Sequence, residues 1–147
     1  MTKMTQIAMI FVMAVVTSLS FGADKPAAGK MIQVVPDDKQ QFLSYWLYLP
    51  KEYDANKDTL PVVLFLHGMG ERGDDLKRVT VHGPPKLIAK GKHFPFIMIA
   101  PQCPKYGDLR DKRAQEYWQM PGSIDKVKNI IDHEKKRLGR VDDDRVY

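Results

Sequence analysis

The stretch Pro61-Val-Val-Leu-Phe-Leu-His-Gly-Met-Gly70 decides the fold. It begins with an apolar run that shows no polar alternation, and such a run is typical of a strand covered on both faces in a parallel sheet. We therefore predict a buried strand over Val62–Leu66. The glycine-rich turn that follows this strand is the first candidate for a functional loop.

The segments around this strand predict alternating strands and helices. An apolar run at Phe96–Ala100 predicts a second buried strand, and Pro84–Lys90 predicts a short helix that has proline in its first turn. Phe42–Leu49 is rich in aromatic residues and suits a strand, whereas Arg145–Tyr147 looks like the start of another strand. The pattern predicts an α/β fold with a parallel centre.

Ser123–Leu138 is the clearest helix in the sequence. We expect Ser123 to cap its N-terminus and Gly139 to adopt the left-handed conformation after its C-terminus. The apolar residues predicted to share its buried face are Ile124, Val127, Ile131 and Leu138, with Ile130 beside them. The lysines and arginine of its last turn complement the helix dipole, so they indicate a structural role.

The first 22 residues read as a secretory signal peptide. Lys3 supplies a positive start, Ile7–Val16 is an uncharged apolar run, and Ser20 and Gly22 are small residues at cleavage spacing. A membrane anchor is the alternative, but the run is short against the ~20 residues that span a bilayer. We expect residues 23–41 to form a leader and first edge segment, residues 42–147 to form the domain, and the protein to be secreted or periplasmic without stable membrane insertion.

Charge and composition exclude several classes of function. Loss of Lys3 with the leader leaves 22 basic and 18 acidic residues, a net charge of +4, and the basic residues are scattered. A nucleic-acid partner is therefore not expected. The single cysteine, Cys103, excludes an intrachain disulfide and is expected to be buried and inert.

No metal or cofactor site is expected either. His133-Glu134 is not followed by a second histidine at zinc-protease spacing. Gly68, Gly70 and Gly73 fit a dinucleotide-binding pattern. That pattern needs an acidic residue about 20 positions further on, and none occurs between Leu76 and Gly107.

His67-Gly-Met-Gly70 instead suits acyl transfer. A glycine-rich turn at the end of a buried strand exposes backbone N–H groups, which can stabilise an oxyanion as it forms. We predict an oxyanion hole at Gly68, Met69 and Gly70, with Met69 N–H as the first donor. We also expect the glycines to permit positive φ and close approach of substrate. The alternative is a tight turn without catalysis.

Several blocks together resemble a known family. Leu64–Asp75 resembles the oxyanion-loop block of secreted bacterial esterases and predicted peptidases of the α/β-hydrolase superfamily, which are related to polyhydroxybutyrate depolymerase-like and prolyl-oligopeptidase-like hydrolases. Ile99–Pro104 resembles their block after the fourth strand, and Trp118 with the following helix resembles the approach to the nucleophile. Val141–Tyr147 resembles the start of the strand that leads into G-x-S-x-G. The similarity covers residues 42–147.

The resemblance implies the N-terminal portion of an α/β-hydrolase fold, with a mostly parallel central sheet truncated before the nucleophile elbow. In this superfamily the triad runs in the order Ser, Asp or Glu, His. All three members are therefore expected beyond Tyr147, and no catalytic residue is assigned here. The implied pocket residues are His67, Glu71, Arg72 and Trp118. Glu71 and Arg72 would border the substrate or brace the loop, with a solvated loop as the alternative, and Trp118 would line the pocket or pack in the core.

The implied function is that of an exported serine hydrolase that acts on carboxylic esters through an acyl-serine intermediate. Peptide bonds are the less favoured target. A small-molecule or polymer ester would be its partner, and no cofactor is expected. The alternative is a non-catalytic exported binding domain, or an inactive truncated product, on the same scaffold.

Overall fold

A computed structural model describes residues 27–37, 40, 42–55, 57–105, 118 and 122–147. The predicted signal peptide lies outside these residues. The described part contains a five-stranded sheet in the order β1-β2-β4-β3-β5. The strands are β1 (Met31–Val34), β2 (Tyr45–Tyr48), β3 (Leu60–Leu64), β4 (Ile97–Pro101) and β5 (Val141–Val146).

The sheet has a parallel half and an antiparallel half. Strand β3 runs parallel to both β4 and β5, and Val63 lies opposite Met98. Strands β1 and β2 pair antiparallel, as do β2 and β4. The predicted α/β fold with a parallel centre is therefore confirmed, and an antiparallel pair extends it on one side.

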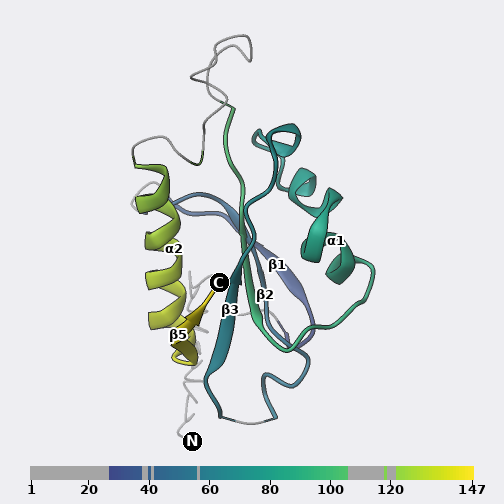
Figure 1. Cartoon of the computed structure of the whole chain (residues 1–147), viewed down its shortest axis with the longest axis vertical. Helices are drawn as coiled ribbons and strands as arrows, with labels where there is room; N and C mark the ends of the chain where they lie inside the picture. Colours follow the sequence, from purple (N-terminus) through teal and green to yellow (C-terminus); the bar gives the residue numbers. More distant parts are fainter. Residues whose placement is uncertain (1–26, 38–39, 41, 56, 106–117, 119–121) are drawn as a thin grey trace, which may run out of the picture.

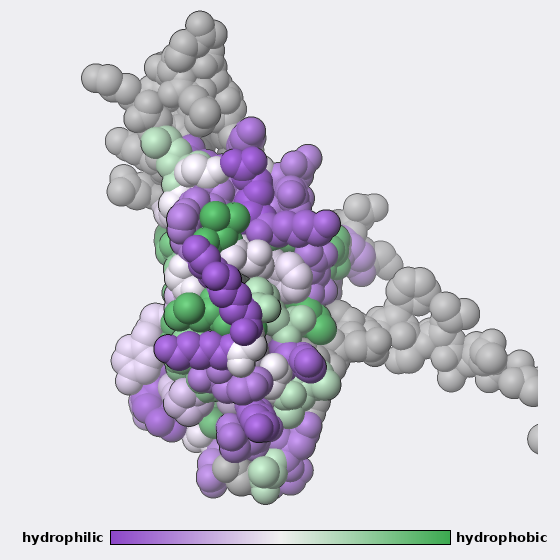
Figure 2. Space-filling model, turned by 90° about the vertical axis from the view of Figure 1, so that its right-hand side faces the viewer, coloured by the Kyte–Doolittle hydropathy of each residue, from purple (hydrophilic) through white to green (hydrophobic). Residues whose placement is uncertain are grey.

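Helices cover both faces of this sheet (Figure 1). One face carries α2 (Ser123–Leu138), and the other carries the 3₁₀ helix η2 (Leu76–Val81) and α1 (Gly83–Ala89). Figure 2 shows the face over α1 as mostly hydrophilic with separate apolar spots. The helices on both faces explain why β3 and β4 need near-continuous apolar sequence.

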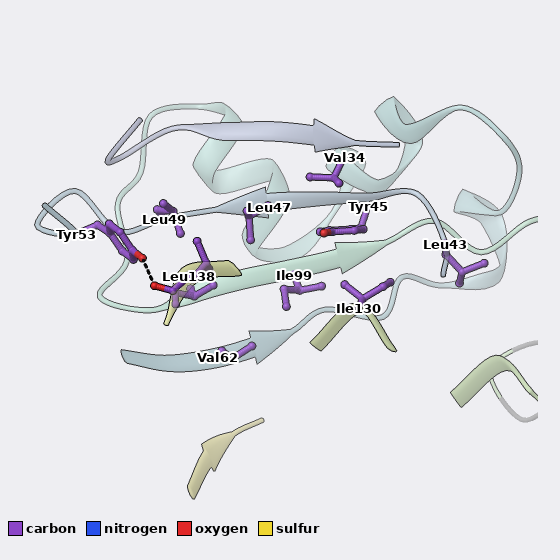
Figure 3. Close-up of a cluster of buried hydrophobic side chains, with 11 residues drawn as sticks. Val34, Leu43, Tyr45, Leu47, Leu49, Tyr53, Val62, Ile99, Ile130 and Leu138 are labelled. Atoms are coloured by element: carbon purple, nitrogen blue, oxygen red, sulfur yellow. Dashed lines mark hydrogen bonds between the residues drawn. The ribbon is translucent and has the colours of Figure 1, made fainter. Parts of the chain in front are cut away.

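Alternate residues of β4 enter two different cores. Ile97 and Ile99 pack with Ile130 and Leu138 of α2 (Figure 3). Met98 and Ala100 pack in a second core with residues of η2 and α1. Every residue of β4 is buried. Because successive side chains of a strand point to opposite faces, this single strand connects the two cores.

Strand boundaries differ from the prediction by a few residues. Strand β3 begins at Leu60 and ends at Leu64, so it lies two residues earlier than expected. The chain still follows β4 beyond this point, because Phe65 N–H donates to Ile99 O at 2.9 Å. Strand β2 is shorter than the predicted Phe42–Leu49, and β5 begins at Val141 instead of near Arg145.

Helix α2 has the predicted bounds but a different N-terminus and a rotated buried face. Its N-cap is Gly122 at φ 80°, no side chain caps it, and Ser123 is buried, so the predicted serine cap is wrong. Ile124 is 57% exposed, so its predicted burial is wrong too. The buried positions after the first turn are Val127, Ile130, Glu134 and Leu138. Gly139 at φ 63° confirms the predicted left-handed end.

A buried polar cluster joins α2 to β2. Glu134 has no exposed surface and accepts hydrogen bonds from the Tyr45 hydroxyl and the Arg137 guanidinium. The Arg137 Nη2 to Glu134 Oε2 distance is 2.8 Å. Burial, together with the neighbouring Glu134 carboxylate, raises the pKa of the Tyr45 hydroxyl, so it remains a donor at neutral pH.

Candidate functional site

The glycine-rich turn lies where the parallel strands β3 and β4 end together. Because parallel strands share one carboxyl edge, the segments that follow them meet there. The N–H of Gly73 donates to the carbonyl of Cys103 at 2.9 Å, which joins the segment after β3 to the segment after β4. The two blocks that the sequence singled out are thus neighbours in space.

Met69–Glu71 forms a single 3₁₀ turn, η1, which begins this loop. The first N–H groups of any helix lack partners within it. Among the described residues the structure records no acceptor for the N–H of Met69 or of Gly70. The Met69 residue is 53% exposed, and Gly70 is exposed as well, so both residues lie at the surface.

The positive φ expected for the two glycines is wrong, whereas the expected close approach of substrate stays a prediction. Neither Gly68 nor Gly70 has positive φ, and Gly68 has φ −76° and ψ 179°, an extended conformation open to any residue. An added Cβ on Gly70 would meet no atom within 4 Å, whereas one on Gly68 would lie 3.0 Å from Glu71 Oε2. Gly70 thus has open space around its Cα, and its backbone conformation does not require glycine.

His67 lies beneath the turn and is 4% exposed. Its Nε2 accepts the N–H of Cys103 at 2.9 Å, and its Nδ1 lies 2.8 Å from the carbonyl oxygen of Gly68. A nitrogen that accepts from an N–H has no proton of its own, so the ring proton is on Nδ1 and is donated to Gly68. Burial lowers the pKa of His67, which keeps the ring neutral at pH 7.

Trp118 lies against the other side of this histidine. Its indole N–H donates to the carbonyl of His67 at 3.0 Å, and the two rings meet edge to face with centroids 5.5 Å apart. Trp118 also packs partly against the core on the α2 side. Trp118 was expected either to line the pocket or to pack in the core. Its contacts are packing contacts, with His67 and with the core.

Glu71 and Arg72 occupy different environments. The Glu71 carboxylate lies 3.4 Å from Nε2 of His82, a residue that the sequence did not connect to the loop. Arg72 is only 5% exposed, and its positive charge partly offsets the rise that burial causes in the pKa of Cys103. The expected alternatives for this pair were a substrate border, an ion-pair brace and a solvated loop. Because Arg72 is buried, it is not part of a solvated loop surface, and it packs beneath the loop.

Residues to which the sequence assigned no role in the loop complete its support. The Gln102 amide Nε2 donates to the carbonyls of Glu71 at 2.8 Å and Cys103 at 3.1 Å. The Arg78 guanidinium donates to the carbonyl of Gly70. Burial raises the pKa of the Cys103 thiol to about 12, so it remains protonated, in keeping with the expected inert role. The one sequence signal for the contacts of Gln102 and Cys103 with the loop is that both residues directly follow a buried strand.

Two clefts lie beside the loop rather than over its exposed donors. One holds about 290 Å³ and is lined by Pro36, Phe42, Leu43, Ser44, Gly73, Asp74, Gln102 and Pro104. The other holds about 220 Å³ and shares Gly73, Asp74 and Pro104 with the first. Among the described residues neither lining includes Gly68, Met69 or Gly70.

The described part of the chain offers neither a metal site nor a membrane-spanning helix. No group of three or more histidine, cysteine, aspartate or glutamate residues is placed to hold a metal ion there. No helix in this part is long and apolar enough to cross a membrane.

Comparison with known proteins gives likenesses among solved structures. No protein-family model and no curated protein matches the chain. The solved structure of a thermostable esterase matches with a TM-score of 0.53 and 26% sequence identity, over 80% of this chain and 33% of the esterase. The chain thus spans about a third of the length of that esterase. The likeness confirms the hydrolase type of α/β fold, and the narrower family within it stays a prediction.

Proposed function

We propose that the chain forms the oxyanion-loop part of an exported serine hydrolase that acts on carboxylic esters. The observation that carries the proposal is the pair of N–H groups of the exposed residues Met69 and Gly70 at the carboxyl edge of β3, for which the described residues supply no acceptor. In α/β-hydrolases the loop after the third strand supplies one oxyanion donor. The structural likeness to an esterase supports the choice of an ester as substrate.

The proposed chemistry assigns this chain an electrostatic role. A serine Oγ attacks the ester carbonyl carbon while the histidine of the triad, expected beyond Tyr147, takes the hydroxyl proton, and the carbonyl oxygen becomes negatively charged in the tetrahedral intermediate. Met69 N–H stabilises that charge, together with the N–H of the residue after the nucleophile. The alcohol then leaves with a proton from the catalytic histidine, and water hydrolyses the acyl-serine. One such donor contributes on the order of 10²–10³ in rate.

Reaction with a fluorophosphonate probe tests the serine mechanism. The polypeptide should be expressed with whatever the gene encodes after Tyr147, because the triad order places the serine there. We expect a G-x-S-x-G within about ten further residues and covalent labelling of its serine. The 147-residue chain is the matched control and should remain unlabelled. Absence of labelling in a folded, longer polypeptide would refute the mechanism.

A binding domain without catalysis is the second candidate. The cleft of about 290 Å³ favours it, because Phe42 and Leu43 supply apolar surface beside the polar Asp74 and Gln102, away from the oxyanion donors. The same labelling experiment separates the two candidates. A longer polypeptide that binds an ester or a polymer but resists the probe would support the binding domain.

We further propose export and removal of the leader. The support is the sequence pattern of residues 1–22, and the proposed location is secreted or periplasmic. Expression in a Gram-negative host should yield a periplasmic protein whose mass corresponds to a start at about Ala23. Recovery of the intact N-terminus in the cytoplasm would contradict export.

A further inference from the structure

We propose that His67 is a positioning residue that fixes the direction of the Met69 N–H through the carbonyl of Gly68. The catalytic meaning of this inference depends on the proposed function, whereas the geometry does not. His67 touches neither Met69 N–H nor a substrate. It acts through the peptide unit that lies between Gly68 and Met69.

The first step of the argument is the planarity of that peptide unit. The carbonyl of Gly68 and the N–H of Met69 belong to one rigid plane and point in opposite directions. Whatever holds the carbonyl therefore aims the N–H. Gly68 O lies 2.8 Å from Nδ1 of His67 and also accepts the N–H of Glu71 at 3.3 Å. The shorter contact comes from the buried ring.

The second step is that the ring itself cannot turn. His67 is 4% exposed, and the backbone N–H of Cys103 donates to its Nε2 at 2.9 Å. The Trp118 indole holds the backbone of the same residue through its carbonyl at 3.0 Å. Because Cys103 follows β4 and Gly68 follows β3, the imidazole bridges the ends of two neighbouring strands. The direction of the Met69 N–H is thus fixed relative to the rigid sheet.

The third step concerns the strength of the donor. A hydrogen bond accepted by a carbonyl polarises its peptide unit, so the N–H on the other end becomes a stronger donor, by about 10–30% per bond. Only one tautomer of His67 supports this arrangement. A proton on Nε2 would face the N–H of Cys103, and the bare Nδ1 would face the carbonyl oxygen of Gly68.

The ring tautomer can be measured directly in the 147-residue chain. Long-range proton–nitrogen NMR correlations distinguish a protonated ring nitrogen from an unprotonated one. The chain has four histidines, and the signals absent from a His67→Asn variant identify those of His67. We expect a protonated Nδ1 and an unprotonated Nε2 at pH 7. The opposite tautomer, measured in the unsubstituted chain, would overturn the proposal.

Two substitutions test the two ring nitrogens of His67 separately. In His67→Asn, the amide nitrogen takes the place of Nδ1 and can still donate to Gly68 O. In His67→Gln, the amide oxygen takes the place of Nε2 and can still accept from Cys103 N–H. The positioning role requires the Met69 amide resonance to stay near its wild-type shift in His67→Asn and to move in His67→Gln. The exposed His93 supplies the control, His93→Asn, which should leave this resonance unchanged.

The reverse order of the two variants, or an unmoved Met69 resonance in both, would refute the positioning role. In the longer polypeptide, His67→Gln should lower kcat by up to about 10²-fold with little change in KM, and His67→Asn should retain more of the rate. Failure of the fluorophosphonate reaction would refute the serine mechanism. The His67 tautomer and the Met69 resonance would still test the positioning role.

Discussion

At the scale of single residues, the sequence located the candidate turn but was wrong to predict positive φ at its glycines. His67-Gly-Met-Gly70 does follow the third strand, yet neither glycine needs positive φ. The backbone angles of a loop depend on its tertiary contacts, which the local sequence does not reveal. A glycine that the structure does require is Gly83, at the first position of α1, where φ is +61°.

Replacement of Gly83 by alanine should destabilise the protein more than the same change at Gly91. Both glycines have positive φ, so each alanine carries backbone strain of about 1–2 kcal/mol. An added Cβ at Gly83 would also lie 2.5 Å from the Phe65 ring, whereas nothing lies within 4 Å at Gly91. The extra cost should be about 1–3 kcal/mol in the free energy of unfolding, measured in urea. Equal losses for the two variants would show that α1 moves away from Phe65 at no cost.

At the scale of elements, sequence patterns found the main strands and helices but misjudged the buried face of α2. The buried positions Val127, Ile130, Glu134 and Leu138 follow helical spacing. The prediction passed over Glu134, because an acidic residue ordinarily faces water. Its burial depends on Tyr45, 89 residues away in the chain, and no local pattern contains that partner. Ile124 was assigned to the buried face by its helical spacing from Val127 and Ile131, but it is 57% exposed and lies outside the observed face.

Removal of the Glu134 carboxylate should therefore be costly. Glu134→Ala leaves Arg137 without its buried partner and Tyr45 without its acceptor, and we expect a loss of about 3–5 kcal/mol in unfolding free energy. Tyr45→Phe removes one hydrogen bond and should cost about 1–3 kcal/mol. Asp132→Ala on the same helix is the control, because its pair with Lys128 is exposed and should contribute about 0.5 kcal/mol. If Glu134→Ala costs no more than Asp132→Ala, the cluster does not hold α2 to β2.

At the scale of the whole molecule, the α/β class was predictable but the strand order was not. Apolar runs of the kind in β3 and β4 indicate coverage on both faces, and the structure has it. The order β1-β2-β4-β3-β5 places β4 between β2 and β3, which follow each other in the chain. Such pairing depends on contacts between distant segments. It is this order that brings Cys103 beside His67 and so assembles the support of the candidate site.

The central position of β4 also predicts that the two cores unfold together. Ile99 belongs to the core on the α2 side, whereas Trp46 packs against the core on the η2 side and donates its indole N–H to Leu76 O at 2.8 Å. In a Trp118→Phe background, Trp46 is the remaining tryptophan and its fluorescence reports the second core.

Adding Ile99→Ala to that background should lower the unfolding free energy by about 2–5 kcal/mol, because it leaves a cavity in the first core. If the cores are one cooperative unit, Trp46 fluorescence and far-UV circular dichroism should both report this loss at the same urea concentration. Ile124→Ala is the control, since its side chain is largely exposed and its removal should change the free energy by about 0.5 kcal/mol or less. A circular dichroism transition that moves while the Trp46 transition stays in place would mean that the two faces of β4 unfold independently.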